Sequence, residues 1–585
     1  MSCRRLASPI GTFLGLSALL LGLSACGSSG SGGQTGPTPT YALMAAALNP
    51  SPVTAGNAAT STITVTPANG YTGSVKLSCS SITGGTPAPT CSFSGNPIAI
   101  TGMAAGTATL TVSTTTTTPG GSYAITVTGS DAKDLAPSNG AQALSLATAA
   151  VIQHIVVIFQ ENRTPDNLFQ DPVLYNPPRS ADIAQSGVNS VGQTITLSPI
   201  DLGTAGSNPQ NYDLSHAHSA FVSMYDGGTM HGADLIPCSP AANCPPNAHP
   251  NPQFMYVKPS DVAPYFALAE QYTFGDRMFQ TNQGPSFPAH QFILAGTSAP
   301  TAGSDLFASE NMSGGSIAGC IATAGTTVTM IDPSGSETIP APEYPCFEHA
   351  TLTDLLDAKS VSWRYYAPSA GSIWTAPDAI DHICLPQTVN GALTCTGTDW
   401  TNNVVIPEWQ VLEDIPNGQL AQVSWIIPDG AHSDHAQSND GSGPSWAAAI
   451  VNEIGNSPYW ANTAIIITWD DWGGWYDHVA PKVVNDGVSW GSGYVYGFRV
   501  PLIVVSPYAK AAYVSHTTHD FGSILKFIES TFSLPSLGYA DAAADDLSDC
   551  FTLTQSPITF QKIPAPLDAA HFINDNSPPT DPDDD

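Results

Sequence analysis

The sequence predicts an α/β domain, a layered sheet with helices on both faces, preceded by a small all-β sandwich. From about residue 150 to 555, short β-branched runs alternate with helical stretches, which is typical of a sheet covered on both faces. Residues 41–147 are instead rich in Thr, Ser, Val, Ala and Gly and carry almost no charge. A chain of 585 residues is long enough to hold both parts.

The predicted sandwich rests on residue alternation. Residues 61–66 (STITVT) and 108–112 (ATLTV) alternate apolar and polar side chains, and turn signals recur at intervals of roughly ten residues. The segments GYTGSVKLSCS, CSFSG and GGSYAITVTG resemble the Ig-like modules of bacterial secreted proteins, and this resemblance implies a disulfide between Cys79 and Cys91. The region has no His and few acids, so we interpret it as a spacer or an adhesion module.

Three continuous apolar runs indicate the strands of the α/β domain. They cover residues 155–159, 464–468 and 500–505, and such runs fit a parallel sheet that is buried on both faces. The last segment, 573–585, is polar and acidic, and we predict a disordered tail there.

The N-terminus predicts export. Residues 1–26 have a basic start and an apolar stretch that is too short for a membrane span. Residues 23–26 (LSAC) resemble the lipobox of a bacterial lipoprotein, which implies cleavage before Cys26 and a lipid anchor on that cysteine. A plain signal peptide is the alternative. Gly27 lacks the inner-membrane retention character of an Asp, which favours the outer membrane or the cell surface, and residues 27–40 read as a flexible tether.

The net charge restricts the partners. The chain has 15 basic and 47 acidic residues, a net charge of −32. Such a surface repels nucleic acid and anionic lipid headgroups, so we exclude nucleic acid as a partner and expect contact with a membrane only through the anchor. A site for phosphate on this chain must be locally positive, and a bound cation is the simplest way to achieve that. The sequence leaves the oligomeric state open.

Cysteine spacing agrees with export. Apart from Cys3 and Cys26 there are nine cysteines, and eight of them are near neighbours in the sequence, which suggests disulfides with short loops. Zinc binding is the alternative, although no C-x-x-C pair is present. The eight are Cys79, Cys91, Cys238, Cys244, Cys320, Cys346, Cys384 and Cys395, and Cys550 is left over.

Acidic residues follow two of the three predicted strands. Glu161 and Asn162 come after the first run, and Asp470 and Asp471 after the second. Ligands of α/β sheets bind beyond the carboxyl ends of the strands, and oxygen ligands gathered there suit a divalent cation. The alternative for each cluster is a solvated turn.

A nucleophile candidate is Ser286, in the segment Gly284-Pro-Ser-Phe-Pro288. Ser286 could cap a helix over about 287–294, whose N–H groups and dipole would hold a phosphate beside the hydroxyl. Most serines in such positions are only caps. With few Lys and Arg in the chain, the cationic groups for phosphoryl transfer must come from histidine and a metal.

Six segments together resemble the bacterial phosphoesterase family, which contains secreted acid phosphatases and non-specific phospholipases C and belongs to the alkaline-phosphatase-like superfamily. The resemblance covers about residues 152–555 and implies an alkaline-phosphatase-like layered sheet. The segments are HIVVIFQENRTPDNLFQ, DLSHAHSAF with DGGTMHG, GPSFPAHQFILAGT, VSWIIPDGAHSDH, IIITWDDWGGWYDHVAP and YGFRVPLIVVSPYAK.

The resemblance also implies the roles of the site residues. Ser286 matches the nucleophile, and His216, His435 and, less closely, His382 match histidines around the phosphate. One divalent metal ion would be held by Glu161, Asn162, Asp470 and Asp471. Two departures stand out: the family's ENRSFDHYFG reads ENRTPDNLFQ, and His290 replaces the usual Asn after the nucleophile.

Three functions follow from this pattern. The first is an acid-phosphatase-like phosphomonoesterase that works through a phosphoserine, and we favour it because the chain ends soon after the phosphoesterase segments. The second is a phospholipase C or phosphodiesterase that cleaves phospholipid headgroups. The third is an inactive surface-binding lipoprotein, against which stands the presence of every residue that the resemblance implies.

Overall fold

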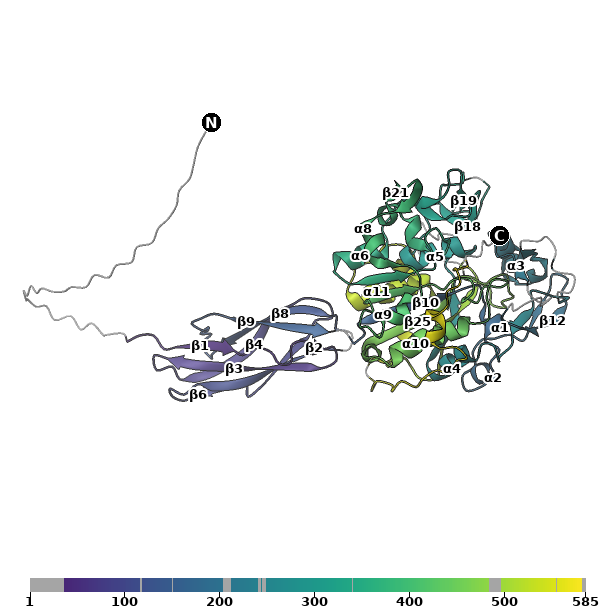
Figure 1. Cartoon of the computed structure of the whole chain (residues 1–585). Helices are drawn as coiled ribbons and strands as arrows, with labels where there is room; N and C mark the ends of the chain where they lie inside the picture. Colours follow the sequence, from purple (N-terminus) through teal and green to yellow (C-terminus); the bar gives the residue numbers. More distant parts are fainter. Residues whose placement is uncertain are drawn as a thin grey trace, which may run out of the picture.

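The computed structural model describes residues 36–115, 118–149, 151–203, 212–239, 244, 249–338, 340–482, 496–553 and 555–580. The predicted signal peptide, the lipobox and most of the tether fall in residues 1–35 and lie outside this description. Figure 1 shows an elongated β-sandwich followed by a larger α/β domain. Within the described residues, none of the helices combines the length and the apolar character that crossing a bilayer requires.

The N-terminal part is an all-β sandwich of two sheets, as predicted for residues 41–147. Burial alternates along its strands, so one face of each sheet forms the core, with Ile63, Leu110 and Ile125 fully buried. A disulfide between Cys79 and Cys91 joins strands of opposite sheets. The assignment of this sandwich to the Ig-like modules stays a prediction. One sheet has the order β1 (Thr40–Ala45), β3 (Ala58–Ala68), β7 (Gly106–Ser113), β5 (Thr90–Ser94); the other has β2 (Val53–Thr54), β9 (Gln142–Ala149), β8 (Gly121–Ser130), β4 (Gly73–Thr83), β6 (Ile98–Ile100).

The α/β domain is built on one large sheet, and this confirms the predicted fold class. Its order is β23 (Val404–Val405), β20 (Trp363–Tyr366), β24 (Val423–Ile426), β10 (His154–Gln160), β25 (Thr463–Trp469), β26 (Arg499–Val505), β17 (Thr273–Phe279), β27 (Tyr513–Ser515), and β28 (His519–Asp520) also pairs with β17. The three predicted runs are β10, β25 and β26, and β10 lies between two parallel neighbours near the middle.

The expectation that the three runs belong to a parallel sheet is wrong for β26, which runs antiparallel to both β25 and β17. A parallel return needs a crossover, usually a helix. The described residues between Trp469 and Arg499, which leave out 483–495, form no helix.

Helices cover both faces of this sheet (Figure 1). On one face α10 (Gly443–Gly455) packs against α4 (Ala263–Gln271), α9 (Gln410–Asp414) and α13 (Ala569–Ile573). On the other face α11 (Phe521–Phe532) packs against α5 (Ser286–Ala295) and α12 (Ala540–Ala543). The other helices are α1 (Pro165–Leu168), α2 (Pro172–Tyr175), α3 (His218–Tyr225), α6 (Leu352–Ala358), α7 (Asp381–Cys384) and α8 (Thr398–Asn403).

Small two-stranded sheets and disulfides stabilise the periphery. The disulfides Cys238–Cys244, Cys320–Cys346 and Cys384–Cys395 confirm the predicted pairing of near neighbours, and Cys550 is free and buried. The paired strands are β11 (Ser186–Val188) with β12 (Thr194–Thr196), β13 (Ser198–Ile200) with β16 (Met255–Val257), β14 (Asp213–Leu214) with β15 (Cys238–Ser239), β18 (Phe307–Ser313) with β19 (Thr327–Ile331), and β21 (Pro386–Val389) with β22 (Ala392–Cys395).

The C-terminal segment packs onto the domain beyond the predicted boundary at 555. Ile563 and Phe572 are fully buried in the main core. Thr580 exchanges backbone contacts with the loop after β24, since its carbonyl accepts from the N–H of Gly430 at 2.8 Å. The prediction of a disordered tail over 573–585 is therefore wrong as far as residue 580, because apolar side chains just before the acidic residues hold the chain in place. Residues 581–585 lie outside the described part.

Candidate active site

The register of β10 and β25 brings the two acidic clusters together. Gln160 is the register partner of Trp469, and the N–H of Asp470 donates to the carbonyl of Gln160 at 2.9 Å. Glu161 and Asp470 therefore leave the carboxyl edge of the sheet side by side. Glu161, Asn162, Asp470 and Asp471 are all fully buried, so neither cluster is a solvated turn.

Asn162 has the left-handed backbone conformation, with φ +62°. Its N–H donates to Asp470 Oδ1 at 2.9 Å, and its side-chain amide nitrogen lies 3.2 Å from His216 Nε2. Gly473 makes room for this turn, because a Cβ at that glycine would lie 2.4 Å from the Asn162 carbonyl oxygen. A non-glycine residue held in this conformation is a strained position, typical of a functional site.

Ser286 is the first residue of α5, and Pro285 occupies the N-cap position. The prediction that Ser286 caps the helix is therefore wrong, because the helix starts one residue earlier and no side-chain cap is made. Its Oγ instead lies 3.5 Å from Glu161 Oε2 and 3.4 Å from Asp471 Oδ2. The N–H of Phe287 donates to Asn311 Oδ1 at 2.8 Å, so one of the N–H groups expected to hold a phosphate is engaged by the protein.

His290 lies one helical turn after Ser286, and it was not among the predicted site residues. Its Nε2 is 3.1 Å from Glu161 Oε1, and ligand atoms of Glu161, His290 and Asp470 all lie within 4.8 Å of one another. The spacing from Ser286 could have revealed it, because residues four apart on a helix lie on the same face.

His216 and His435 face one another, with ring centroids 6.0 Å apart. His216 Nδ1 lies 2.8 Å from the carbonyl of Leu214, and His435 Nδ1 lies 2.6 Å from the carbonyl of Ala436. An imidazole that donates from Nδ1 to a carbonyl keeps Nε2 as the acceptor while it is neutral. In His216 that Nε2 faces the amide of Asn162.

Arg163 connects the Glu161 turn to the loop that carries His435. Its guanidinium donates from Nε and Nη2 to the carbonyl of Asp434 at 2.9 and 2.7 Å. Asp434 Oδ2 accepts from Tyr265 Oη and Trp469 Nε1, each at 2.9 Å, and burial raises the pKa of Asp434 to about 6. The loop is thereby fixed relative to β25, which ends at Trp469.

A network of ion pairs lies next to the turns that carry Glu161 and Asp471. Arg499 of β26 pairs with Asp477 Oδ1 at 3.0 Å and with Asp166 Oδ1 at 3.3 Å. His478 Nδ1 lies 2.7 Å from Asp166 Oδ2. Burial lowers the pKa of His478, but its hydrogen bonds to Asp166 and Asp182 outweigh this and raise it to about 10. The network ties the segment after Glu161 to the segment after Asp471.

His382 is placed apart from this group. Its ring lies between Glu348, with Nδ1 3.1 Å from Oε1, and Asp354, with Nε2 3.3 Å from Oδ1. Within the described residues no hydrogen bond or ion pair joins it to Ser286 or to the other predicted site residues. Its catalytic role stays a prediction from the resemblance.

The carboxylate group fits a divalent cation. Asp470 Oδ2 and Asn162 Oδ1 are buried and have no hydrogen-bond partner. A buried polar oxygen without a partner costs free energy unless another group satisfies it. Glu161, Asn162, Asp470 and Asp471, with His290 beside them, supply the oxygen and nitrogen ligands that such a cation takes.

A model of the phosphoesterase family matches residues 152–535. The chain belongs to the phosphoesterase family. Within this family, hemolytic phospholipase C of Pseudomonas aeruginosa is 26% identical over 425 residues, which cover 66% of this chain and 53% of that protein. Phospholipase C B of Mycobacterium tuberculosis is 24% identical over 466 residues, which cover 69% of this chain and 78% of that protein. The chain thus spans about half the length of the Pseudomonas relative.

Among solved structures, a protein in the alkaline phosphatase superfamily from Vibrio parahaemolyticus overlaps 68% of this chain and 70% of its own, at 9% identity and a TM-score of 0.29.

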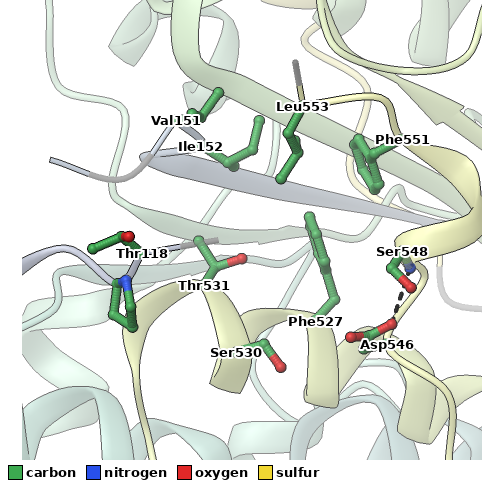
Figure 2. Close-up of a pocket in the computed structure, with 11 residues that line it drawn as sticks. Thr118, Val151, Ile152, Phe527, Ser530, Thr531, Asp546, Ser548, Phe551 and Leu553 are labelled. Atoms are coloured by element: carbon green, nitrogen blue, oxygen red, sulfur yellow. Dashed lines mark hydrogen bonds between the residues drawn. The ribbon is translucent and has the colours of Figure 1, made fainter. Parts of the chain in front are cut away.

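A mostly apolar pocket, shown in Figure 2, shares no lining residue with this site. It is lined by Ile152 before β10, Phe527 and Thr531 of α11, Leu553, and Thr118 of the sandwich. None of the predicted catalytic residues lines it, so its hollow is not the reaction centre of this phosphoesterase.

Proposed function

We propose that this chain hydrolyses phosphate esters through a phosphoserine formed on Ser286. The observation that carries the proposal is the position of Ser286 Oγ within 3.5 Å of two buried carboxylates that come from different strands of one sheet edge. These two carboxylates, Glu161 and Asp471, are among the four residues that the resemblance assigns to a metal.

One divalent metal ion would be held by Glu161, Asn162, Asp470 and Asp471. When bound, it would neutralise the phosphoryl oxygens and lower the pKa of the Ser286 hydroxyl. Side chains of the protein carry out the nucleophilic attack and the proton transfer. The Ser286 hydroxyl loses its proton to solvent as Oγ attacks phosphorus in line. The bond from phosphorus to the leaving oxygen breaks, and His435 or His216, when protonated, gives a proton to that oxygen. Water then hydrolyses the phosphoserine ester, which frees Ser286 and releases phosphate from a monoester or the phosphorylated headgroup from a phospholipid.

We propose a phospholipid headgroup as the substrate, because the relatives described above are both named phospholipase C. The monoesterase activity favoured by the sequence alone stays the second candidate, and the inactive surface protein the third. The three candidates differ in which substrate the purified chain would hydrolyse: a phospholipid, a phosphomonoester or neither.

The test is a substrate panel of phosphatidylcholine, bis-p-nitrophenyl phosphate and p-nitrophenyl phosphate, with and without a chelator. Ser286→Ala should lose at least about 10³-fold in kcat on every substrate that is turned over, because it lacks the attacking atom. Ser298→Ala, which removes another buried serine just after the same helix, is the control and should keep activity. Turnover of p-nitrophenyl phosphate alone would select the monoesterase, and no turnover of any substrate would refute the enzyme.

We also propose that the chain is exported and anchored by lipid at Cys26, in the outer membrane or at the cell surface. The sequence LSAC supports this, and so do the disulfides, which persist in oxidising compartments.

A further inference from the structure

A second group of ligand-type side chains lies outside the site described above. Glu408 follows β23, Asp429 and His432 belong to the loop after β24, and Asp575 follows α13. Ligand atoms of Glu408, Asp429 and His432 lie within 4.8 Å of one another. These three side chains are only 3%, 4% and 5% exposed. We call Glu408, Asp429, His432 and Asp575 the Glu408 cluster.

The contacts inside the Glu408 cluster are short but are not hydrogen bonds. His432 Nδ1 lies 3.0 Å from Asp429 Oδ1, and His432 Nε2 lies 3.3 Å from Asp575 Oδ2. Neither ring nitrogen makes a hydrogen bond of acceptable direction, and Glu408 Oε2 is buried without any partner. Atoms brought close together without hydrogen-bond directionality are what ligands around a common centre show.

The charge of the Glu408 cluster is unbalanced. It contains three carboxylates and one imidazole, and within the described residues no Lys or Arg pairs with any of the four. Even with His432 protonated, the ionised cluster would be negative, and buried charge without a counter-charge is costly. A divalent cation among these side chains would remove that cost.

The ligand set selects the kind of cation. Imidazole with carboxylates suits zinc, which takes four ligands in a tetrahedron with bonds of about 2.0 Å, so that neighbouring ligand atoms lie roughly 3.3 Å apart. The separation of 3.0 Å between His432 Nδ1 and Asp429 Oδ1 is close to this edge length. One ion can take only one nitrogen of an imidazole, so Asp575, which lies 3.3 Å from Nε2, would orient the ring from outside the ligand shell. We propose that Glu408, Asp429 and Nδ1 of His432 bind a structural divalent cation of the zinc type, separate from the cation proposed at Glu161.

Such a site would fasten the C-terminal segment to the loop that carries His435. The N–H of Thr580 donates to Asp429 Oδ2 at 3.1 Å, and the ring of Phe572 lies 5.1 Å from that of His432. A cation on Nδ1 of His432 would fix this ring, and the contact of its Nε2 with Asp575 would tie the segment to the loop. His435 follows His432 by three residues, so the same link would hold the catalytic loop.

The experiment measures the number of zinc ions bound per chain, with the full chain. The double variant Glu161→Gln/Asp470→Asn removes two charges from the proposed catalytic metal group, and it should still retain one zinc per chain after dialysis, measured by mass spectrometry of the metal. Zinc should also raise its Tm. Adding Glu408→Gln should abolish both the retained zinc and the rise in Tm, although its fold without metal is expected to persist because a buried charge has been removed.

Asp575→Asn provides a second variant that should fold, since this side chain is 28% exposed near the end of the chain. In the same double-variant background it should weaken zinc binding by about 10-fold or more, the usual loss when a carboxylate that orients a ligating histidine is removed. Zinc retention unchanged by both Glu408→Gln and Asp575→Asn would overturn the proposal. So would a double variant that binds no zinc. If wild type binds a single zinc that Glu408→Gln abolishes, the Glu408 cluster is supported and the group around Glu161 does not hold zinc.

Discussion

His290 Nε2 lies 3.1 Å from Glu161 Oε1, and this contact joins helix α5 to the end of strand β10. Ser286 is on the same face of α5, one turn earlier, and it faces Glu161 Oε2. Glu161 therefore contacts both Ser286, the proposed nucleophile, and His290, a position where the resemblance implies an Asn.

We predict that His290→Ala weakens binding of the catalytic metal by about 10- to 100-fold, as expected for a side chain that ligates the ion or orients its ligand. His290→Asn restores the usual family residue and should recover part of the loss. Metal titration followed by calorimetry measures both. Equal affinity in wild type and His290→Ala would show that His290 only fills space beside Glu161.

Removal of charge from the carboxylate group should remove metal and activity together. Glu161→Gln and Asp470→Asn each take one negative charge from the same buried group, so bound metal per chain and kcat should fall in parallel, and chelator should inactivate wild type. Asp234→Asn, which affects a surface loop contact with Ser190, is the matched control. An Asp470→Asn enzyme that stays active without metal would contradict the proposed mechanism.

The leaving group should distinguish the roles of His435 and His216. If His435 protonates the leaving oxygen, His435→Ala should slow alkyl phosphates far more than p-nitrophenyl phosphate, because nitrophenolate leaves without needing a proton. The same comparison with His216→Ala shows whether that ring acts instead. A loss that is the same on both substrates in both variants would assign the two rings to phosphate binding.

His382 should stabilise the fold in a pH-dependent way. The close contact of its ring with the Asp354 carboxylate raises the pKa of His382 to about 9, against the effect of burial. A raised pKa means that the folded protein holds the proton more tightly, so this stability is fully present below about pH 6.5 and is lost as the pH rises through about 9. His382→Gln should therefore unfold at lower denaturant than wild type at pH 6, and the difference should shrink towards pH 9.5.

The comparison with Glu348→Gln checks the cause, because that variant removes one of the two carboxylates beside the ring. It should show a smaller effect with the same pH dependence. A His382→Gln deficit that does not change with pH would mean that packing, not charge, accounts for the loss.

If Cys26 carries the lipid anchor, Cys26→Ala should release the chain from membranes or block its processing, because the lipid is attached to that cysteine. Mass spectrometry of the mature N-terminus measures this directly. An unmodified N-terminus at another residue would disprove the anchor and leave the plain signal peptide.

Much of the fold follows from local pattern. The apolar runs at 155–159, 464–468 and 500–505 became β10, β25 and β26, because continuous β-branched segments have few other ways to be buried. Short spacing between cysteines was enough to predict their pairing. The direction of β26 was not predictable, since it depends on how the segment from Asp470 to Phe498 returns to the sheet.

For the site, the sequence by itself predicted which residues carry the chemistry: carboxylates directly after two strands and a serine at the start of a helix are local features. The tertiary structure alone decided which of them meet. The parallel register sets Glu161 beside Asp470, while His382 pairs with Asp354 and Glu348 elsewhere. The Glu408 cluster draws on segments from residue 408 to 575, and no local periodicity records contacts that packing makes between distant segments.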